Sequence, residues 1–124
     1  MFEELKIKLF GNQPAAKLTT KQLDRLIQRE FAQHFDEVKT RLHKVESETP
    51  NGKRRISAAI IRLSNRNLKS LDHYIALAKG DYRDILLPAE YPRCARLSFD
   101  DIDKREMKSI YLDDWREYSK WLND

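Results

Sequence analysis

An apolar stripe with helical spacing constrains the fold of this chain more than any other feature. Between Thr19 and Glu48 the sequence contains neither glycine nor proline. The stripe predicts one long N-terminal helix at about residues 19–47. Such a helix would be roughly 40 Å long and would outreach a single small domain, so we expect its far end to pack on another chain. The apolar residues recur every three or four positions, which places them on one helix face: Leu23, Leu26, Ile27, Phe31, Phe35, Val38, Leu42 and Val45.

Shorter helical patterns fill most of the remaining sequence. After a turn at 49–52, we expect helices at about 53–64, 68–79 and 81–87, and a last helix that begins near Ser98. Gly80 and Pro88 are expected to end two of these helices, and residues 1–18 to form an arm or a short helix. Only three glycines and four prolines interrupt 124 residues, which is the length of one domain. The prediction is an all-α single domain at residues 1–124, a bundle of four to five helices.

The composition favours a cytoplasmic protein of bacterial type. Cys94 is the only cysteine, which excludes an intrachain disulfide and suits a reducing compartment. Acidic residues precede the first lysine, unlike a signal peptide, and no stretch approaches the roughly 18 apolar residues of a membrane span. We therefore expect a complete cytoplasmic chain. The run from Ala58 to Pro92 resembles segments of small bacterial helical proteins, and this resemblance implies helices but no catalytic residue.

Sequence patterns that carry nucleotide or thiol chemistry are weak in this chain. Gly11, Gly52 and Gly80 lie far apart, whereas a phosphate-binding loop needs several glycines close together. No local motif joins Cys94 to a histidine base, which a reactive thiol would need. An ordinary buried thiol is therefore predicted at this position.

Metal-binding patterns are equally weak. His34 and Glu37 reverse the Glu-x-x-His order of di-iron helix bundles, and the sequence holds no second copy. Further acidic residues cluster at 100–103 and 113–114, where carboxylates in a first helical turn would stabilise the helix dipole. We predict a protein that is not an enzyme, with no catalytic residue, no cofactor and no metal.

A run of unneutralised basic residues occupies the middle of the chain. Between Thr49 and Leu71 there are six basic residues and no acidic one. One interpretation is nucleic-acid binding by the helix pair at 53–69, arranged as a helix-turn-helix with arginines on phosphates. A net charge of only +4 makes this the alternative hypothesis. Its candidate contacts are Lys53, Arg54, Arg55, Arg66 and Lys69.

The interpretation that we favour is a protein–protein interaction or regulatory module. Tyrosine and arginine are enriched at the energetic centres of interfaces, and several of them gather around two prolines at 82–96. The partner would be another protein, or a second copy bound through helix 19–47. Two internal explanations stay open: Arg83 pairs with a nearby aspartate, or the basic stretch attracts the acidic C-terminal helix of the same molecule. The candidate partner-binding residues are Arg55, Arg62, Arg83, Tyr91 and Arg93.

Overall fold

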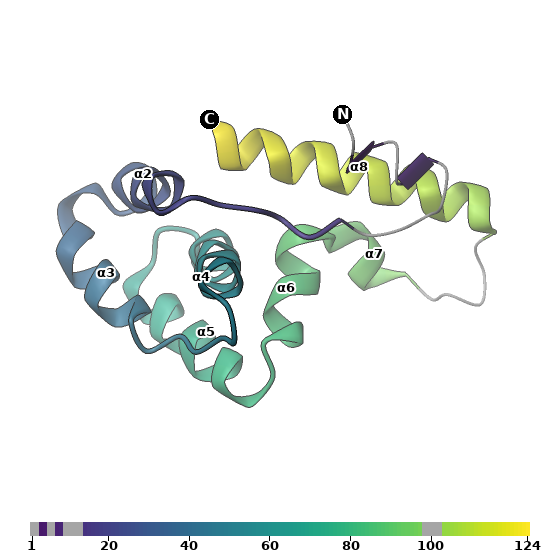
Figure 1. Ribbon diagram of the computed structural model, residues 1–124. Coiled ribbons are helices and arrows are strands. Elements are labelled where there is room, and N and C mark those ends of the chain that lie inside the picture. The colour runs from purple at the N-terminus through teal and green to yellow at the C-terminus, as the bar shows by residue number, and fades with distance from the viewer. Residues whose placement is uncertain (1–2, 5–6, 9–13, 98–102) are drawn as a thin grey trace.

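The computed structural model describes residues 3–4, 7–8, 14–97 and 103–124 (Figure 1). No strand occurs within these ranges, and the predicted all-α class is confirmed. The elements are α2 (Thr20–Glu30), the 3-10 helix η1 (Ala32–His34), α3 (Phe35–Leu42), α4 (Pro50–Ser64), α5 (Leu68–Gly80), α6 (Arg83–Glu90), α7 (Pro92–Arg96) and α8 (Lys104–Asn123).

Helix α4 lies at the centre of the molecule, with α2, α5 and α6 packed around it (Figure 1). Residues 56–61 are all buried, and the small side chains of Ala58 and Ala59 let the neighbouring helices approach closely. The helix begins at Pro50. A backbone N–H at this first position has no partner within the helix, so proline removes no hydrogen bond. Thr49 caps it by accepting a hydrogen bond from the Gly52 amide (2.9 Å). The expected turn at 49–52 is thus the cap and first turn of α4.

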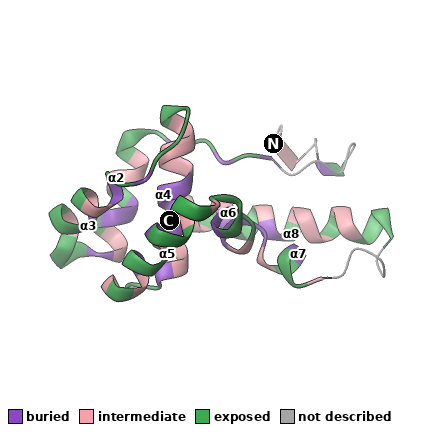
Figure 2. Ribbon diagram, turned by 90° about the horizontal axis from the view of Figure 1, so that it is seen from below, coloured by how far each residue is buried: buried purple, intermediate pink, exposed green. Residues whose placement is uncertain are grey.

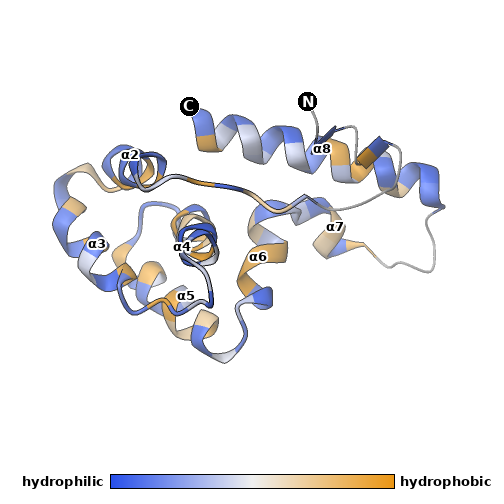
Figure 3. Ribbon diagram, in the orientation of Figure 1, coloured by the Kyte–Doolittle hydropathy of each residue, from blue (hydrophilic) through white to orange (hydrophobic). Residues whose placement is uncertain are grey.

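The hydrophobic core forms where the other helices face α4. Figure 2 shows the buried positions concentrated on α4 and on the inward faces around it. Figure 3 shows hydrophobic residues where α4, α5 and α6 face one another, and polar residues on the outward faces. Ile27, Ile60, Leu71 and Ile85, which come from four different helices, are completely inaccessible to solvent.

The predicted single helix at 19–47 is wrong, because this segment folds as α2, η1 and α3 and its last helix ends at Leu42. Phe31 leaves the helical conformation (φ −137°, ψ 48°), and α2 and α3 point in different directions (Figure 1). This bend lets α2 pack on α4 and α3 pack on α5, whereas a straight helix would carry half of the stripe away from the core. The stripe is buried within the protein itself, at Leu26, Ile27, Phe31, Val38, Leu42 and Val45.

Three other predicted boundaries differ from the structure or lie outside it. Gly80 is the last residue of α5 rather than the residue after it, and α6 continues through Pro88 to Glu90. The expected start of the last helix near Ser98 lies outside the described residues. Helix α8 begins at Lys104, and Asp103 caps it by accepting a hydrogen bond from the Glu106 amide (2.8 Å).

An extended arm, Pro14–Thr19, runs between α4 and α8 toward α2 (Figure 1). Asn51 of α4 fixes it by accepting a hydrogen bond from the Leu18 amide (3.0 Å) and donating one to the Ala16 carbonyl (3.3 Å). The Tyr91 hydroxyl donates to the Pro14 carbonyl (3.0 Å). This part of the predicted 1–18 arm is therefore a well-anchored extended segment, while residues 1–2, 5–6 and 9–13 lie outside the described residues.

Helix α8 lies across α6 and α7 and approaches α2 with its C-terminal end (Figure 1). Two guanidinium groups contact the Trp121 ring there, that of Arg29 at 5.2 Å and that of Arg62 at 5.3 Å from the ring centre. The indole nitrogen donates to Glu30 Oε1 (3.2 Å). Cation–π contacts and one hydrogen bond thus hold the end of α8 on the bundle.

Candidate functional site

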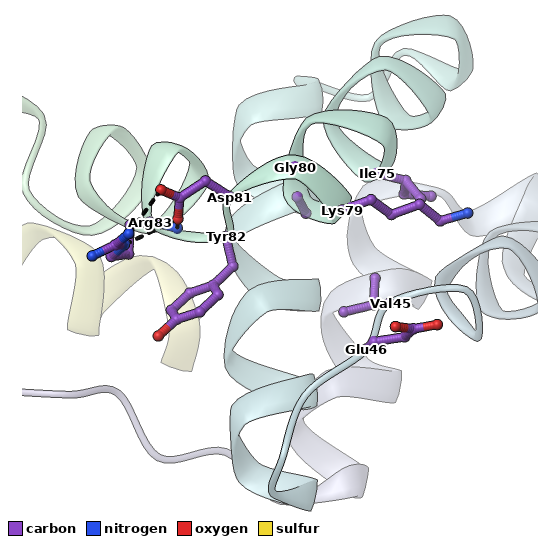
Figure 4. Close-up of a pocket in the computed structure, with 9 residues that line it drawn as sticks. Val45, Glu46, Ile75, Lys79, Gly80, Asp81, Tyr82 and Arg83 are labelled. Carbon is purple, nitrogen blue, oxygen red and sulfur yellow. Dashed lines mark hydrogen bonds and ion pairs between the residues drawn. The ribbon is translucent and has the colours of Figure 1, made fainter.

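Two adjoining hollows, each of about 590 Å³, lie beside the loop between α3 and α4 and the corner between α5 and α6. They share Glu46 and Tyr82. We call them together the corner groove, bounded by residues 45–49 on one side and 78–83 on the other. Figure 4 shows the hollow nearer α5, with Val45 and Glu46 on one side and Tyr82 on another.

The floor of the corner groove is apolar and belongs to the core. Val45, Ile56, Ile75 and Leu86 line it and are each buried to more than nine-tenths. Tyr82 stands at its edge with 49% of its surface exposed. The groove therefore offers a large aromatic side chain to solvent beside an apolar floor.

The backbone of the corner is held by local hydrogen bonds. Asp81 accepts hydrogen bonds from the Arg83 amide (3.0 Å) and from the Arg83 guanidinium (3.0 and 3.1 Å), and this guanidinium lowers the pKa of Asp81. The Tyr82 carbonyl accepts from the amides of Ile85 and Leu86, both at 3.1 Å. Its side chain makes no hydrogen bond within the described part of the chain. The position of Tyr82 is thus fixed by its neighbours, while its ring remains available.

Half of the charged residues that line the corner groove are neutralised by neighbouring residues. Arg55 forms two hydrogen bonds with the buried carboxylate of Glu90, from Nε (2.9 Å) and from the terminal nitrogen NH2 (2.7 Å). These bonds raise the pKa of Arg55. Glu46, Glu48 and Lys79 are exposed, and no ion pair joins them to any residue that the structure describes.

The five candidate partner-binding residues do not form one surface. Arg55 and Arg83 both line the corner groove, and the local pairing of Arg83 with Asp81, left open by the sequence, is observed. The other three lie elsewhere: Arg62 packs over the Tyr118 ring of α8 at 5.2 Å, Tyr91 is buried, and Arg93 pairs with Asp114 (2.8 Å) and Glu117 (2.6 Å).

The basic stretch at 53–69 is largely engaged inside the molecule. Lys53 donates to the His43 carbonyl (3.2 Å), Arg54 to the Leu18 carbonyl (2.5 Å), and Arg66 pairs with Glu30 (3.0 Å). Of the five candidate nucleic-acid contacts, including Arg55 on Glu90, only Lys69 has no such partner among the described residues. The acidic partners come from α2 and α6, and α8 contributes aromatic rings to Arg62 instead of carboxylates.

The titratable side chains that could suggest catalysis are either buried or paired with a neighbouring residue. Cys94 is buried, and burial together with a hydrogen bond to Asp114 raises its pKa to about 12, so the nucleophilic thiolate is scarce at neutral pH. His34 and Glu37 pair with each other (3.4 Å) on the surface. In the ranges that the structure describes, no three His, Cys, Asp or Glu residues cluster as metal ligands would.

Sequence reasoning missed two features of the structure, the lining of the corner groove and the role of Asp114. Glu46, Glu48 and Tyr82 come from segments more than 30 residues apart, and no local pattern indicates that they line one hollow. Asp114 is 1% exposed and accepts hydrogen bonds from the amides of Arg93 (3.1 Å) and Cys94 (3.2 Å). The sequence suggested only helix-dipole stabilisation for this acidic residue, whereas it caps another helix, α7.

Comparison with known proteins supplies no relative from which a role could be transferred. No protein-family model matches the chain, and neither a curated protein nor a solved structure matches it. Among the helices described, none is both long and apolar enough to cross a membrane. Any function must therefore be argued from the site itself.

Proposed function

We propose that this protein is a non-enzymatic protein–protein interaction module that binds its partner in the corner groove. The observation that carries the proposal is Tyr82, half exposed between two hollows with core residues as their floor. Tyrosine brings a large contact area with few rotatable bonds, and it is enriched at the energetic centres of interfaces.

The local hydrogen bonds of the corner support the same proposal. The Asp81–Arg83 hydrogen bonds and the Tyr82 carbonyl bonds hold the α5–α6 corner in place. A partner would therefore find Tyr82 already positioned, and binding would lose little conformational entropy at this residue. An apolar floor surrounded by polar residues is also the usual arrangement of a protein interface.

Self-association, which the sequence suggested through helix 19–47, has a weaker basis. Leu42 and Val45, the residues expected to meet another chain, are buried in the core at 4% and 3% exposure. A charged residue at either position would unfold the protein rather than dissociate a dimer. A second copy bound in the corner groove would be detected as a concentration-dependent molecular mass.

Nucleic-acid binding remains the alternative function. Helix α4, residues 65–67 and α5 form two consecutive helices joined by a three-residue turn, as the helix-turn-helix hypothesis expects. Its test is the salt dependence of binding to duplex DNA, because neutralising Z phosphates gives a slope of about −0.9Z against the logarithm of salt concentration. The internal pairing of Arg55 and Arg66 makes us rank it second.

The experiment that tests the proposed function is site-specific crosslinking in native cells. A photo-reactive phenylalanine analogue replaces Tyr82 in one variant and Leu87 in another. Leu87 is the matched control, because it is exposed (36%) on α6, the helix that directly follows Tyr82, but lines neither hollow. We expect protein adducts at position 82 that survive nuclease treatment and are absent at position 87. Equal adducts at both positions, or adducts that nuclease removes, would contradict the proposal.

A further inference from the structure

The uncompensated charge of the corner groove indicates which kind of partner it fits. Two of its cations are cancelled within the molecule, Arg83 by Asp81 and Arg55 by the buried Glu90. Glu46 and Glu48 are left on one side of the groove, and Lys79 on the other. The hollow that contains both glutamates thus carries two carboxylates, with no cation left to balance them among the described residues that line it.

Tyr82 adds a second, independent contact for a cation. Its ring borders the hollow that contains Glu46 and Glu48, and half of its surface is open to solvent. The face of an aromatic ring attracts lysine and arginine side chains, and nearby carboxylates strengthen the attraction. The apolar stem of such a side chain would lie against Ile56 and Leu86 on the groove floor.

We propose that the end of the corner groove beside Glu46, Glu48 and the Tyr82 ring binds a lysine or arginine side chain of a partner protein, while an apolar residue of the same partner segment packs on the apolar floor of the groove. This inference rests on the proposed function. It also predicts how the partner segment is oriented, because Lys79 opposes Glu46 in the hollow at the α5 end, whereas Glu46 and Glu48 act together in the other hollow. The partner's basic residue lies at the Glu48 end.

The test is selection from a random 12-residue peptide library displayed on phage, with the full-length protein as bait. We expect the selected peptides to contain more lysine and arginine than the input library, together with at least one apolar residue. Their selection should disappear with the Tyr82→Ser variant. The affinity of one synthetic selected peptide is then measured by fluorescence anisotropy.

Charge variants locate the cation within the groove. Glu46→Gln with Glu48→Gln should weaken the peptide about fivefold, since two exposed ion pairs are lost, and Lys79→Gln should strengthen it. The matched control is Asp36→Asn with Asp113→Asn, which changes the net charge equally at two exposed carboxylates outside the groove. Equal weakening by the control would show unspecific attraction and overturn the inference.

The remaining outcomes separate this inference from the proposed function. Peptides that depend on Tyr82 but show no excess of basic residues would support protein binding in the groove. They would overturn the inference that the partner contributes a lysine or arginine. Failure to select any peptide that is sensitive to Tyr82→Ser would overturn both. A dimer in light scattering that Tyr82→Ser dissociates would assign the groove to a second copy and overturn the inference.

Discussion

At the scale of single residues, two buried tyrosines differ in one hydrogen bond. The Tyr91 hydroxyl donates to the Pro14 carbonyl (3.0 Å), whereas the Tyr118 hydroxyl has no hydrogen-bond partner among the described residues. We expect Tyr118→Phe to raise the free energy of unfolding by about 1 kcal/mol, because it removes a polar group buried without a partner. Tyr91→Phe should lower it by about 1 kcal/mol. Urea denaturation measures both, and a loss in Tyr118→Phe would contradict the assignment.

The Arg55–Glu90 pair makes the sharpest prediction about single side chains. Removing one partner leaves a desolvated charge behind, so Arg55→Met should cost about 3 kcal/mol of unfolding free energy. This value lies at the lower end of the usual loss of unfolding free energy for a broken buried ion pair. The reason is that the Arg55 side chain is 26% exposed, whereas that of Glu90 is 3% exposed.

The double variant Arg55→Met with Glu90→Leu serves as the control for this pair. Two apolar side chains can replace a buried ion pair with little loss of stability. We therefore expect the double variant to recover most of the stability that Arg55→Met loses. A double variant as unstable as the sum of the two single variants would show that the charges act independently.

At the scale of elements, Asp114 joins α7 to α8. It accepts hydrogen bonds from two amides at the start of α7 and from the Arg93 guanidinium. Asp114→Ala should therefore cost about 2–3 kcal/mol of unfolding free energy and speed hydrogen exchange at the Arg93 and Cys94 amides. The neighbouring Asp113→Ala is the control, because Asp113 is exposed and its loss should stay within about 0.5 kcal/mol. Similar losses in the two variants would contradict the capping role.

The elements also show where local patterns predict structure well. Asn67 caps α5 by accepting a hydrogen bond from the Ser70 amide (3.0 Å), as its position before an apolar run indicates. Pro88 shows the opposite case. Burial of Ile85, Leu86 and Ala89 in one short helix stabilises α6 enough to carry it through a proline that its local sequence would place at a helix end.

At the scale of the whole molecule, burial of the phenols predicts how stability changes in alkali. Burial raises the pKa of both Tyr91 and Tyr118. In the unfolded chain these phenols ionise near pH 10, while in the folded protein they keep their protons. The stabilisation is therefore complete below pH 10 and is lost as the pH rises above it, by about 1.4 kcal/mol per pH unit for each tyrosine.

Denaturation at pH 9 and at pH 11 measures this dependence. Lysines also titrate in this range, so the comparison between wild type and Tyr118→Phe isolates the tyrosine. We expect the variant to lose stability with pH less steeply than the wild type. Parallel slopes would mean that the Tyr118 phenol ionises in the folded protein as readily as in the unfolded chain.

The sequence by itself determined the helical class and part of the core. Helical spacing and helix caps depend on neighbours three or four positions away, so they can be read without a structure. Leu26, Ile27, Phe31, Val38, Leu42 and Val45 of the stripe are buried, although the segment that carries them is divided into α2, η1 and α3 and Phe35 is only partly buried. Whether a helix face is buried depends on the residues of that face. The direction of the chain depends on how the helices pack together.

Only the tertiary structure decided how the charges of the basic stretch are used and where the corner groove lies. Arg55 meets Glu90 across 35 positions and Arg66 meets Glu30 across 36, and Tyr82 and Glu46 line the same two hollows. Whether such distant residues meet depends on the packing angles of whole helices. Those angles are set by the sum of many core contacts, so they cannot be predicted from any short stretch of sequence.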